Sequence, residues 1–373
     1  MLICAALSDK PCKIYCADTN DDIDATVSCL QALGAKISRE NGCFIVSPIL
    51  SLPEEAALDC RESGSTLRFL LPLSAALGIS TTFILESRLK ERPLSPLWEE
   101  LERMGCRLHR TPDNNIQCSG KLLPGDYKIS GDISSQFITG LLLALSILHG
   151  DSTLSIIEPI QSRPYIDITK SVLSFFGVNT DSYPIHGQYP LNGPHTLSVE
   201  GDWSNAAFFL VANALGSNIR ISGLNADSIQ GDREIVSHIK ASGQMVVIDV
   251  AQIPDLMPVL SVYFAANKGA VFTNIQRLRL KESDRVSAVR NMLHSMGIHT
   301  EETNTTLTVY PGKLQGCTVN SYNDHRIAMS AAIAATIAEG PITITNAQCV
   351  NKSYPSFWED IAKLGGIYEL LEG

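Results

Sequence analysis

The stretch LLPLSAALG, from Leu70 to Gly78, decides the fold, because it belongs to a pattern that recurs along the chain. It is apolar nearly all round and ends on glycine, which predicts a buried helix that stops at Gly78. A second helix-like segment, SPLWEELERMG, has polar faces and ends at Gly105. We therefore expect a buried helix, a strand, a surface helix and another strand in this part of the chain.

The same two segments recur at nearly constant spacing. Apolar helices are predicted to end near Gly78, Gly150, Gly216, Gly269 and Gly340. Helices with polar faces are predicted to end 27, 27, 27, 28 and 25 residues later, at Gly105, Gly177, Gly243, Gly297 and Gly365, and one more precedes them and ends at Gly34. Self-similarity at a fixed period is typical of repeat architectures, so we expect six βα-rich repeats.

Counting 27 residues back from Gly34 leads to position 7, inside the opening stretch MLICAAL. We expect this stretch to be the last two turns of the first buried helix, with SDKPC leading into a strand. It is not typical of a secretory signal, which has a charged start, a longer apolar run and a cleavage site. The polar turn that starts each other buried helix would lie upstream of Met1, so the chain is expected to start within a repeat.

The composition excludes several classes of protein. The 373 residues suffice for two domains, and the net charge of −10 argues against general nucleic-acid binding, which favours a basic surface. Ten cysteines at irregular spacing, with no CxxC pair, indicate reduced thiols in a cytoplasmic protein and no metal-ligand pattern. The most apolar run, Phe137–Leu148, is shorter than the ~20 residues that span a membrane.

Polar turns precede the buried helices, and several carry more functional groups than a helix cap needs. They read ESGSTLR, GDISSQF, EGDWSN, IPDLMP and YNDHRIA. Ser, Thr and Asp are ordinary helix caps, but Arg68, Gln136, His325 and Arg326 are not. Because a helix N-terminus offers free N–H groups and a positive dipole, such turns bind phosphate or carboxylate.

Two basic runs add cations to this set, RLKERPL (Arg88–Leu94) and RLRLKESDR (Arg277–Arg285). Charge runs of this kind are usually solvated loops, and that remains the ordinary interpretation. These are nevertheless the densest basic runs in an acidic chain. Together with the polar turns, they favour a cleft for strongly anionic ligands.

Four strings in this order, GDISSQF, SRPYIDIT, LRLKESDR and YNDHRIAM, resemble those of the EPSP synthases (3-phosphoshikimate 1-carboxyvinyltransferases) of the enolpyruvyl transferase family. The resemblance runs from Met1 to the C-terminus. It implies an α/β (α+β) fold, a two-domain inside-out α/β barrel of six βαβαββ repeats, the first of them truncated. Three repeats would form an N-terminal lobe (residues 1–199) and three a C-terminal lobe (residues 200–373), closing like a hinge on the substrates.

The implied reaction transfers the enolpyruvyl group of phosphoenolpyruvate to the 5-hydroxyl of shikimate 3-phosphate and releases phosphate through a tetrahedral intermediate. No metal and no organic cofactor is implied. The partners would be these two small molecules, bound by a cytoplasmic monomer with no nucleic-acid or membrane partner. Two phosphates and two carboxylates must be brought together, and Arg and Lys side chains suit such anions.

The resemblance also assigns roles to residues of the matching strings. Those expected to hold shikimate 3-phosphate are Ser134, Ser135, Gln136, Ser162, Tyr165, Asp255 and Lys281. Those expected to hold phosphoenolpyruvate are Gly64, Arg92, Gln136, Arg285, Arg326 and Lys352. Asp255 would orient and deprotonate the hydroxyl, and Glu282 and His325 would act at the reacting carbon or phosphate, with Glu282 as the expected proton shuttle. Arg68 would lie near this group, in either a binding or a structural role.

The chain departs from the resemblance at two points. Arg277 occupies a position at which better-known members carry an Asn that contacts the shikimate ligand. A turn of the PGSKS type, whose Lys, Ser and Arg contact both substrates, is expected upstream of Met1, so the activity of this chain is expected to be impaired. Two alternatives stay open: a catalytically weak protein that binds shikimate 3-phosphate, and an enolpyruvyl transferase that acts on another acceptor.

Overall fold

In the computed structural model of the chain, helix α3 (Gly64–Leu77) is the apolar helix that the stretch around Leu70 predicts. Ser63 caps its start, because its hydroxyl accepts a hydrogen bond from the backbone N–H of Thr66. Gly78 ends it in the left-handed conformation, with φ of 75°. Most of its residues are buried, as expected of a helix that is apolar nearly all round.

The structure describes residues 1–241 and 244–371, so the predicted helix end at Gly243 lies outside the described residues. The chain divides into Met1–Val199 (unit 1) and Glu200–Gly373 (unit 2), and each unit has its own apolar core. Within the described part of the chain, every helix is too short or too polar to cross a membrane.

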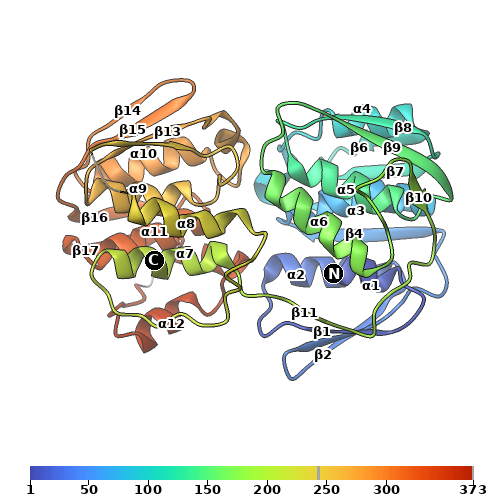
Figure 1. Ribbon diagram of the computed structural model, residues 1–373, viewed down its shortest axis with the longest axis horizontal. Helices are drawn as coiled ribbons and strands as arrows, with labels where there is room; N and C mark the ends of the chain where they lie inside the picture. The colour runs from blue at the N-terminus through green and yellow to red at the C-terminus, as the bar shows by residue number, and fades with distance from the viewer. Residues whose placement is uncertain (242–243, 372–373) are drawn as a thin grey trace. The chain divides into compact units, whose positions relative to one another are not determined.

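Unit 1 combines buried and surface helices with small sheets (Figure 1). Its helices are α1 (Leu2–Ala6), α2 (Asp21–Ala32), α3, the 3-10 helix η1 (Ser87–Lys90), α4 (Leu97–Arg103), α5 (Ser135–Leu145) and α6 (Arg163–Phe175). Its strands are β1 (Cys12–Tyr15), β2 (Lys36–Glu40), β3 (Cys43–Ser47), β4 (Glu55–Arg61), β5 (Ser80–Leu85), β6 (Cys106–Arg110), β7 (Ile116–Gly120), β8 (Asp126–Ser130), β9 (Gly150–Ile157), β10 (Ile185–Gly187) and β11 (Thr196–Ser198).

Unit 2 is built in the same way. Its helices are α7 (Trp203–Ala214), η2 (Gly231–Glu234), α8 (Ile235–Lys240), α9 (Met257–Ala265), η3 (Gln276–Leu280), α10 (Arg285–Ser295), α11 (His325–Ala335), η4 (Ala347–Lys352) and α12 (Phe357–Lys363). Its strands are β12 (Val246–Asp249), β13 (Ala270–Thr273), β14 (Thr300–Glu302), β15 (Thr306–Val309), β16 (Gln315–Asn320) and β17 (Glu339–Thr345).

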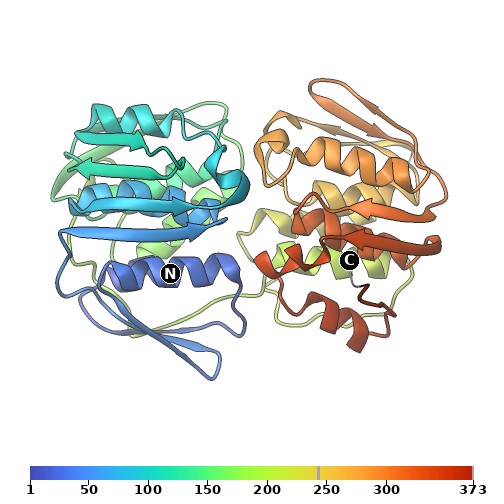
Figure 2. The same ribbon diagram turned by 180° about the vertical axis from the view of Figure 1, so that it is seen from behind.

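One sheet order recurs in both units (Figure 2). The orders β11-β1-β3-β2, β4-β5-β7-β6 and β12-β13-β15-β14 have the same pattern of directions. In each, the first two strands run parallel and the last two form an antiparallel pair beside them. The pairs β4-β5 and β12-β13 are each joined across a helix and followed by a hairpin, as a βαβαββ repeat requires, whereas β11 comes to β1 from the other end of unit 1. The repeat predicted from the glycine spacing is therefore present as a structural unit.

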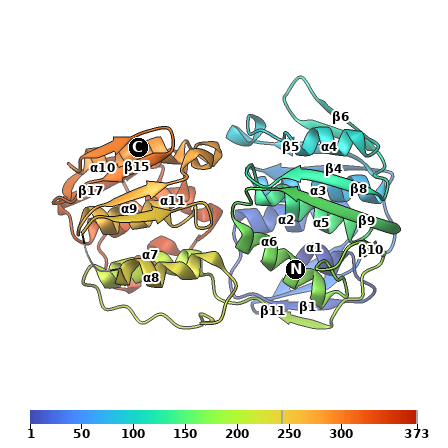
Figure 3. The same cartoon turned by 45° about the horizontal axis from the view of Figure 1, so that its top comes forward.

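The apolar helices lie side by side within each unit (Figure 3). In unit 1, α3 packs against α5, and in unit 2, α11 packs against both α7 and α9. Every residue of α9 is buried. The opening stretch forms α1, whose residues Ile3–Ala6 are buried and which leads into β1, as the spacing from Gly34 predicts.

The backbone confirms the conformation expected of the repeated glycines, although Gly150 is the first residue of β9 and Gly340 lies in β17, so these two lie in strands rather than at helix ends. Outside the undescribed residues, the predicted helix-ending glycines all have positive φ, between 75° and 123°. They are Gly34, Gly78, Gly105, Gly150, Gly177, Gly216, Gly269, Gly297, Gly340 and Gly365. A residue with a side chain is strained in this region, so these positions explain why the chain uses glycine there.

The repeats are not equally developed. The described segment 217–230, between α7 and η2, forms no strand, although the pattern predicts one there. Side-chain hydrogen bonds hold this segment instead: Ser228 and Gln230 both donate to a carboxylate oxygen of Glu200, at 2.7 and 2.9 Å. Two local bonds, from the Asp227 N–H to the Asn225 side chain and from the Gln230 N–H to the Ser228 hydroxyl, compete with a strand ladder for the same stretch of backbone.

Helices α3 and α5 approach each other at one point that depends on a glycine. Pro72 has no N–H, so it cannot donate the helical hydrogen bond to the Arg68 carbonyl, four residues earlier. A Cβ placed on Gly140 of α5 would lie 2.1 Å from that carbonyl oxygen and 2.9 Å from Cγ of Pro72. Only glycine therefore allows the two backbones to come this close.

We predict that Gly140→Ala destabilises the protein, because the new methyl group must push α5 away from the rigid Arg68 carbonyl. The expected loss in the free energy of unfolding is about 1–3 kcal/mol, typical of overpacking. Urea unfolding followed by circular dichroism measures it. Ser171→Ala on α6, which adds no atoms, is the control and should change the free energy of unfolding by less than about 0.5 kcal/mol; equal stabilities for the two variants would contradict the prediction.

Candidate active site

Three packed helices of unit 2 begin at or next to predicted site residues. Helix α10 begins at Arg285, α11 begins at His325, and Asp255 lies two residues before α9. The helices α9, α10 and α11 all pack against one another. Contacts between their first turns, described below, show that the positive ends of these helices meet in one region of unit 2.

The Arg285 guanidinium is the centre of this region. It donates to Asp255 Oδ1 and Glu282 Oε2, each at 2.7 Å, and to Asp324 Oδ2 at 3.0 Å. The side chain is only 1% exposed. Burial alone would lower the pKa of Arg285, but the carboxylates of Asp324, Glu282 and Asp255 raise it well above its ordinary value. The arginine therefore carries its charge at any physiological pH.

Asp324 is the most deeply buried of the three carboxylates and anchors the cluster. Its Oδ1 caps α11 by accepting from the backbone N–H of Arg326 at 3.1 Å, and its Oδ2 accepts from the Ser283 hydroxyl at 3.0 Å. Burial would raise the pKa of Asp324, but the Arg285 charge outweighs it and lowers the pKa. The YNDHRIA turn is thus fixed to the KESDR segment through one carboxylate.

Asp255 is surrounded by cations. Besides Arg285, it pairs with Arg326 Nη2 at 3.1 Å from Oδ2 and with Lys281 Nζ at 3.8 Å from Oδ1. Burial would raise the pKa of Asp255, but Arg326, Lys281 and Arg285 together hold it well below its usual range. The Asp255 carboxylate is therefore ionised and weakly basic in this state.

Two further predicted residues, Lys281 and His325, have pKa values that are lowered mainly by burial. Burial, together with the nearby charge of Arg277, lowers the pKa of Lys281 to about 8 against the opposing effect of Asp255. Burial and the Arg326 charge lower the pKa of His325 to about 4. His325 is consequently neutral at pH 7, while Lys281 is charged but close to losing its proton.

Two residues of this region were missed by the sequence analysis: Ser204, which lies in the quoted turn EGDWSN, and Asp232, which lies in none of the quoted strings. Asp232 of η2 is 4% exposed, and burial followed by the Asp255 charge raises its pKa to about 7. Ser204, in the second position of α7, accepts a hydrogen bond from Arg326 Nη1 at 2.6 Å. In the sequence, each is one more polar residue at a helix start, where a capping role is the ordinary interpretation.

In unit 1, two guanidinium groups lie against the first residue of α3. A Cβ built on Gly64 would be 2.6 Å from Arg92 Nη1 and 2.7 Å from Arg68 Nη1. Arg68 Nη1 also donates to Gln136 Oε1 at 2.8 Å. The N-terminus of α3, two arginines and one amide therefore meet at one point, which is suited to an anion.

The predicted serines lie at the starts of two neighbouring helices of unit 1. Ser134 and Ser135 are the N-cap and first residue of α5, and Ser162 is the N-cap of α6, in the left-handed conformation with φ of 54°. The Tyr165 N–H donates to the Ser162 carbonyl at 3.1 Å. Helices α5 and α6 pack together, and the Gln161 N–H donates to the Gly131 carbonyl at 3.0 Å, so the segments that lead into the two helices lie next to each other.

The remaining predicted residue, Lys352, ends η4, which packs against α11 in unit 2. Within the part of the chain that the structure describes, no group of three or more His, Cys, Asp or Glu side chains is arranged to hold a metal ion.

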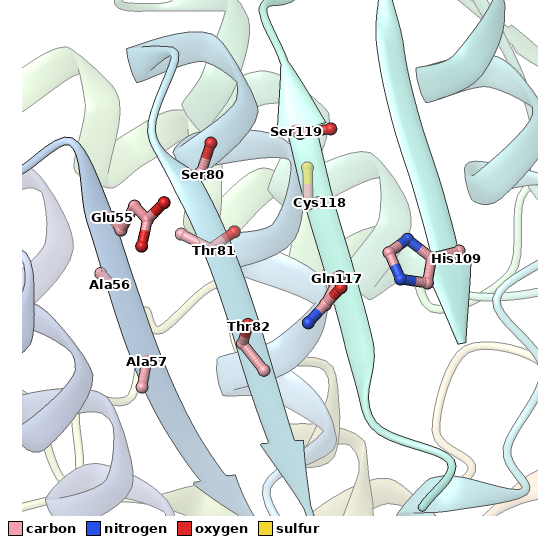
Figure 4. Close-up of a pocket in the computed structure, with 10 residues that line it drawn as sticks. All are labelled: Glu55, Ala56, Ala57, Ser80, Thr81, Thr82, His109, Gln117, Cys118 and Ser119. Carbon is pink, nitrogen blue, oxygen red and sulfur yellow. The ribbon is translucent and has the colours of Figure 1, made fainter. Parts of the chain in front are cut away.

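A cavity of about 400 Å³ lies elsewhere in unit 1, over the sheet β4-β5-β7-β6 (Figure 4). It is lined by residues of all four strands, among them Glu55, Thr82, Gln117 and His109. None of the predicted site residues lines it. The cavity is therefore separate from the arginine pair at Gly64.

The chain is similar to known proteins in both sequence and fold. The family model described as EPSP synthase (3-phosphoshikimate 1-carboxyvinyltransferase) matches residues 1–361. Proteins named 3-phosphoshikimate 1-carboxyvinyltransferase from Clostridium kluyveri and Clostridium beijerinckii are 40% and 37% identical to this chain, over 98% and 99% of it and 92% of each relative. Two structures of EPSP synthase from Acinetobacter baumannii match with TM-scores of 0.77 and 0.78, at 24% and 23% identity, over 98% and 100% of this chain and 92% and 94% of theirs.

The structural matches identify the fold as the two-domain inside-out α/β fold of this class of transferases, as expected. The sequence matches go further: the chain belongs to the EPSP synthase family. It is an enzyme, an enolpyruvyl transferase of the shikimate pathway, and its substrates are small molecules.

The Lys281 ammonium group predicts an alkaline limit to activity. Since its pKa is about 8, the lysine is charged below pH 8 and neutral above it, so binding of an anionic substrate should weaken as the pH rises. We expect kcat/KM to fall above pH 8 in the parent enzyme. In Lys281→Arg, whose side chain keeps its charge, this fall should move to higher pH even if the rate is lower.

The control for this pH profile is Lys313→Arg, because the Lys313 side chain is 84% exposed. It should leave the alkaline fall where it is in the parent enzyme. An unchanged profile in Lys281→Arg would show that another group sets the alkaline limit.

Proposed function

We propose that this enolpyruvyl transferase moves the enolpyruvyl group of phosphoenolpyruvate to the 5-hydroxyl of shikimate 3-phosphate and releases phosphate. The observation that carries the proposal is the cluster of unit 2, in which Asp255 is in contact with Lys281, Arg285 and Arg326. A reaction between two anionic substrates needs such cations to bind them. A proton transfer from a hydroxyl needs a carboxylate beside the bound substrates.

Asp255 is the proposed base for the 5-hydroxyl. Its basicity is suppressed by the charges of Arg326, Lys281 and Arg285. Anionic substrate groups that bind Lys281 and Arg326 would compete with Asp255 for them, which would raise the pKa of Asp255 toward a value suited to accepting a proton. Binding of the substrates thereby activates the base.

Glu282 is the proposed proton shuttle at the reacting carbon. It is held by Arg285 Nη2 at 2.7 Å through one oxygen, and its side chain is 18% exposed. His325 is the other candidate at the reacting carbon or phosphate, and at pH 7 its neutral ring offers either a donor or an acceptor. Because the pKa of His325 is about 4, its ring carries no acidic second proton near pH 7, so we assign the proton transfer first to Glu282.

The phosphoenolpyruvate contacts proposed in unit 2 are Arg285, Arg326 and Lys352. Arg326 is the strongest candidate, because its side chain is 11% exposed whereas Arg285 is almost completely enclosed by carboxylates. Because the Arg285 side chain is only 1% exposed, a direct bond from it to the substrate would require one of the surrounding carboxylates to move aside. The assignment of Arg285 therefore carries this additional condition.

In unit 1, Gly64 and Arg92 are the proposed contacts for phosphoenolpyruvate, and Gln136 the proposed contact for both substrates. The hydroxyls and amide of the α5 and α6 turns suit a phosphate with several hydroxyl neighbours, as in shikimate 3-phosphate. The proposed contacts there are Ser134, Ser135, Ser162 and Tyr165. We further propose that the protein acts without a cofactor, as a cytoplasmic monomer that binds neither nucleic acid nor membrane.

Steady-state release of phosphate tests the proposed function. It should require both phosphoenolpyruvate and shikimate 3-phosphate, and UDP-N-acetylglucosamine should not replace the latter. Asp255→Asn and Glu282→Gln keep the shape but remove the proton acceptor, so each should lower kcat by about 10²–10⁴-fold. Glu301→Gln, at a solvent-exposed carboxylate, is the matched control and should leave kcat unchanged. Full activity of both site variants would refute the assignment.

Gly64→Ala tests the anion contact in unit 1. The added Cβ would displace the Arg92 and Arg68 guanidinium groups that now lie 2.6 and 2.7 Å from its position. We expect KM for phosphoenolpyruvate to rise about tenfold, which corresponds to ~1.4 kcal/mol, with the protein still folded. Gly312→Ala makes the same chemical change next to Ile298 and should not alter KM. If KM for phosphoenolpyruvate is the same in both variants, this contact is not used.

A further inference from the structure

The Arg326 side chain is held on two sides. On one side, Nη2 pairs with Asp255 Oδ2 at 3.1 Å, and Nη1 donates to the Asp255 carbonyl at 3.3 Å. On the other side, Nη1 donates to the Ser204 hydroxyl at 2.6 Å. The Asp255 carboxylate is the partner with which an anionic substrate would compete, whereas Ser204 is a neutral group that can stay bound throughout.

The Ser204 hydroxyl also lies close to the Asp232 carboxyl. A hydroxyl that accepts a hydrogen bond from Arg326 has its own hydrogen left to donate. The Asp232 carboxyl lies close enough for Ser204 and the Arg326 charge both to favour its ionised form, against the effect of burial. Ser204 and Asp232 are both buried, so the chain from Arg326 through Ser204 to Asp232 lies away from solvent.

A separate network of hydrogen bonds holds the segments that carry Ser204 and Asp232 in place. The Gln230 side chain donates to the Gly201 carbonyl at 2.9 Å and accepts from the Trp203 N–H at 3.0 Å. The Trp203 ring N–H donates to the Asn225 carbonyl at 3.0 Å. These bonds tie the segment before η2 to the start of α7, so Asp232 and Ser204 are positioned together.

We propose that Ser204 is a positioning residue of the enzyme: backed by Asp232, it holds the Arg326 guanidinium in the orientation that binds the anionic group of phosphoenolpyruvate. This inference rests on the proposed function of Arg326. It assigns a role in substrate binding to two turns, EGDWSN with Ser204 and Gln230–Asp232 with Asp232, that neither sequence suggests by itself.

The proposal has a specific kinetic signature. When substrate takes the place of the Asp255 carboxylate, Arg326 loses one of its supports and depends on Ser204 for orientation. A contact that orients a binding group equally in the ground state and the transition state changes KM but not kcat. Loss of the Ser204 hydroxyl should therefore raise KM for phosphoenolpyruvate selectively.

The first test compares Ser204→Ala with Ser204→Thr. Ser204→Ala should raise KM for phosphoenolpyruvate five- to tenfold, with kcat and KM for shikimate 3-phosphate within twofold of the parent enzyme. Ser204→Thr keeps the hydroxyl and should restore KM to within twofold. Ser261→Ala, which removes a buried helical hydroxyl bonded only to the Pro258 carbonyl, is the matched control and should change none of these constants.

The second test is a double-mutant cycle. Because Asp232 is proposed to act through Ser204, Asp232→Ala should raise KM for phosphoenolpyruvate, and the variant that combines it with Ser204→Ala should be no worse than the more affected single variant. If the two increases in KM multiply in the double variant, the residues act independently, and the proposal that Asp232 acts through Ser204 is refuted. Urea unfolding of each variant establishes that the measured enzyme is folded.

Arg326→Lys separates failure of this inference from failure of the proposed function. If Arg326→Lys leaves KM for phosphoenolpyruvate unchanged, the assignment of Arg326 is wrong and the inference falls with it. If Arg326→Lys raises KM but folded Ser204→Ala does not, the proposed function stands and the positioning role of Ser204 is refuted. A fall in kcat without a change in KM for folded Ser204→Ala would also refute it.

Discussion

The arrangement of unit 2 depends on one buried cation, the Arg285 guanidinium, which bonds to three carboxylates. Desolvation makes a buried charge costly unless it is fully paired, and here every side of the guanidinium has a partner. Removing Arg285 would leave Asp324, which is 0% exposed, as an unpaired buried charge. Such a cluster is poor evidence for stability, but it fixes the relative positions of the helix starts that supply its members.

The repeated fold explains how these groups come together. Each repeat buries an apolar helix, and the polar residue that begins the helix is left at its positive end. In unit 2 these ends belong to α7, α9 and α11, and each carries a residue of the cluster or of its support: Ser204, Asp255 and Arg326. Rigid helices and sheets thereby hold the side chains more accurately than loops would.

Much of this structure could be predicted from the sequence, because the glycines that end helices and the spacing between them are local signals. The strings around Ser135, Lys281 and His325 likewise pointed to anionic ligands. The bonds from Arg285 to Asp324 and from Arg326 to Ser204 join residues 39 and 122 positions apart. Burial and partners at such separations depend on tertiary packing, so neither the enclosure of Arg285 nor the contribution of Asp232 could be predicted from local pattern.

Two acidic side chains close to Arg326 have pKa values that are shifted in opposite directions. Asp255 has three cations close to it, and its pKa is held low; Asp232 is buried close to the negative charge of Asp255, and its pKa is about 7. The titrations of Asp255 and Asp232 are linked, because the charge of each carboxylate affects the pKa of the other. An anionic substrate that draws Arg326 and Lys281 away from Asp255 must therefore change the proton affinity of both carboxyls. The cluster can then couple the arrival of phosphoenolpyruvate to the readiness of Asp255 to accept a proton, because the same cations serve the substrate and restrain the base.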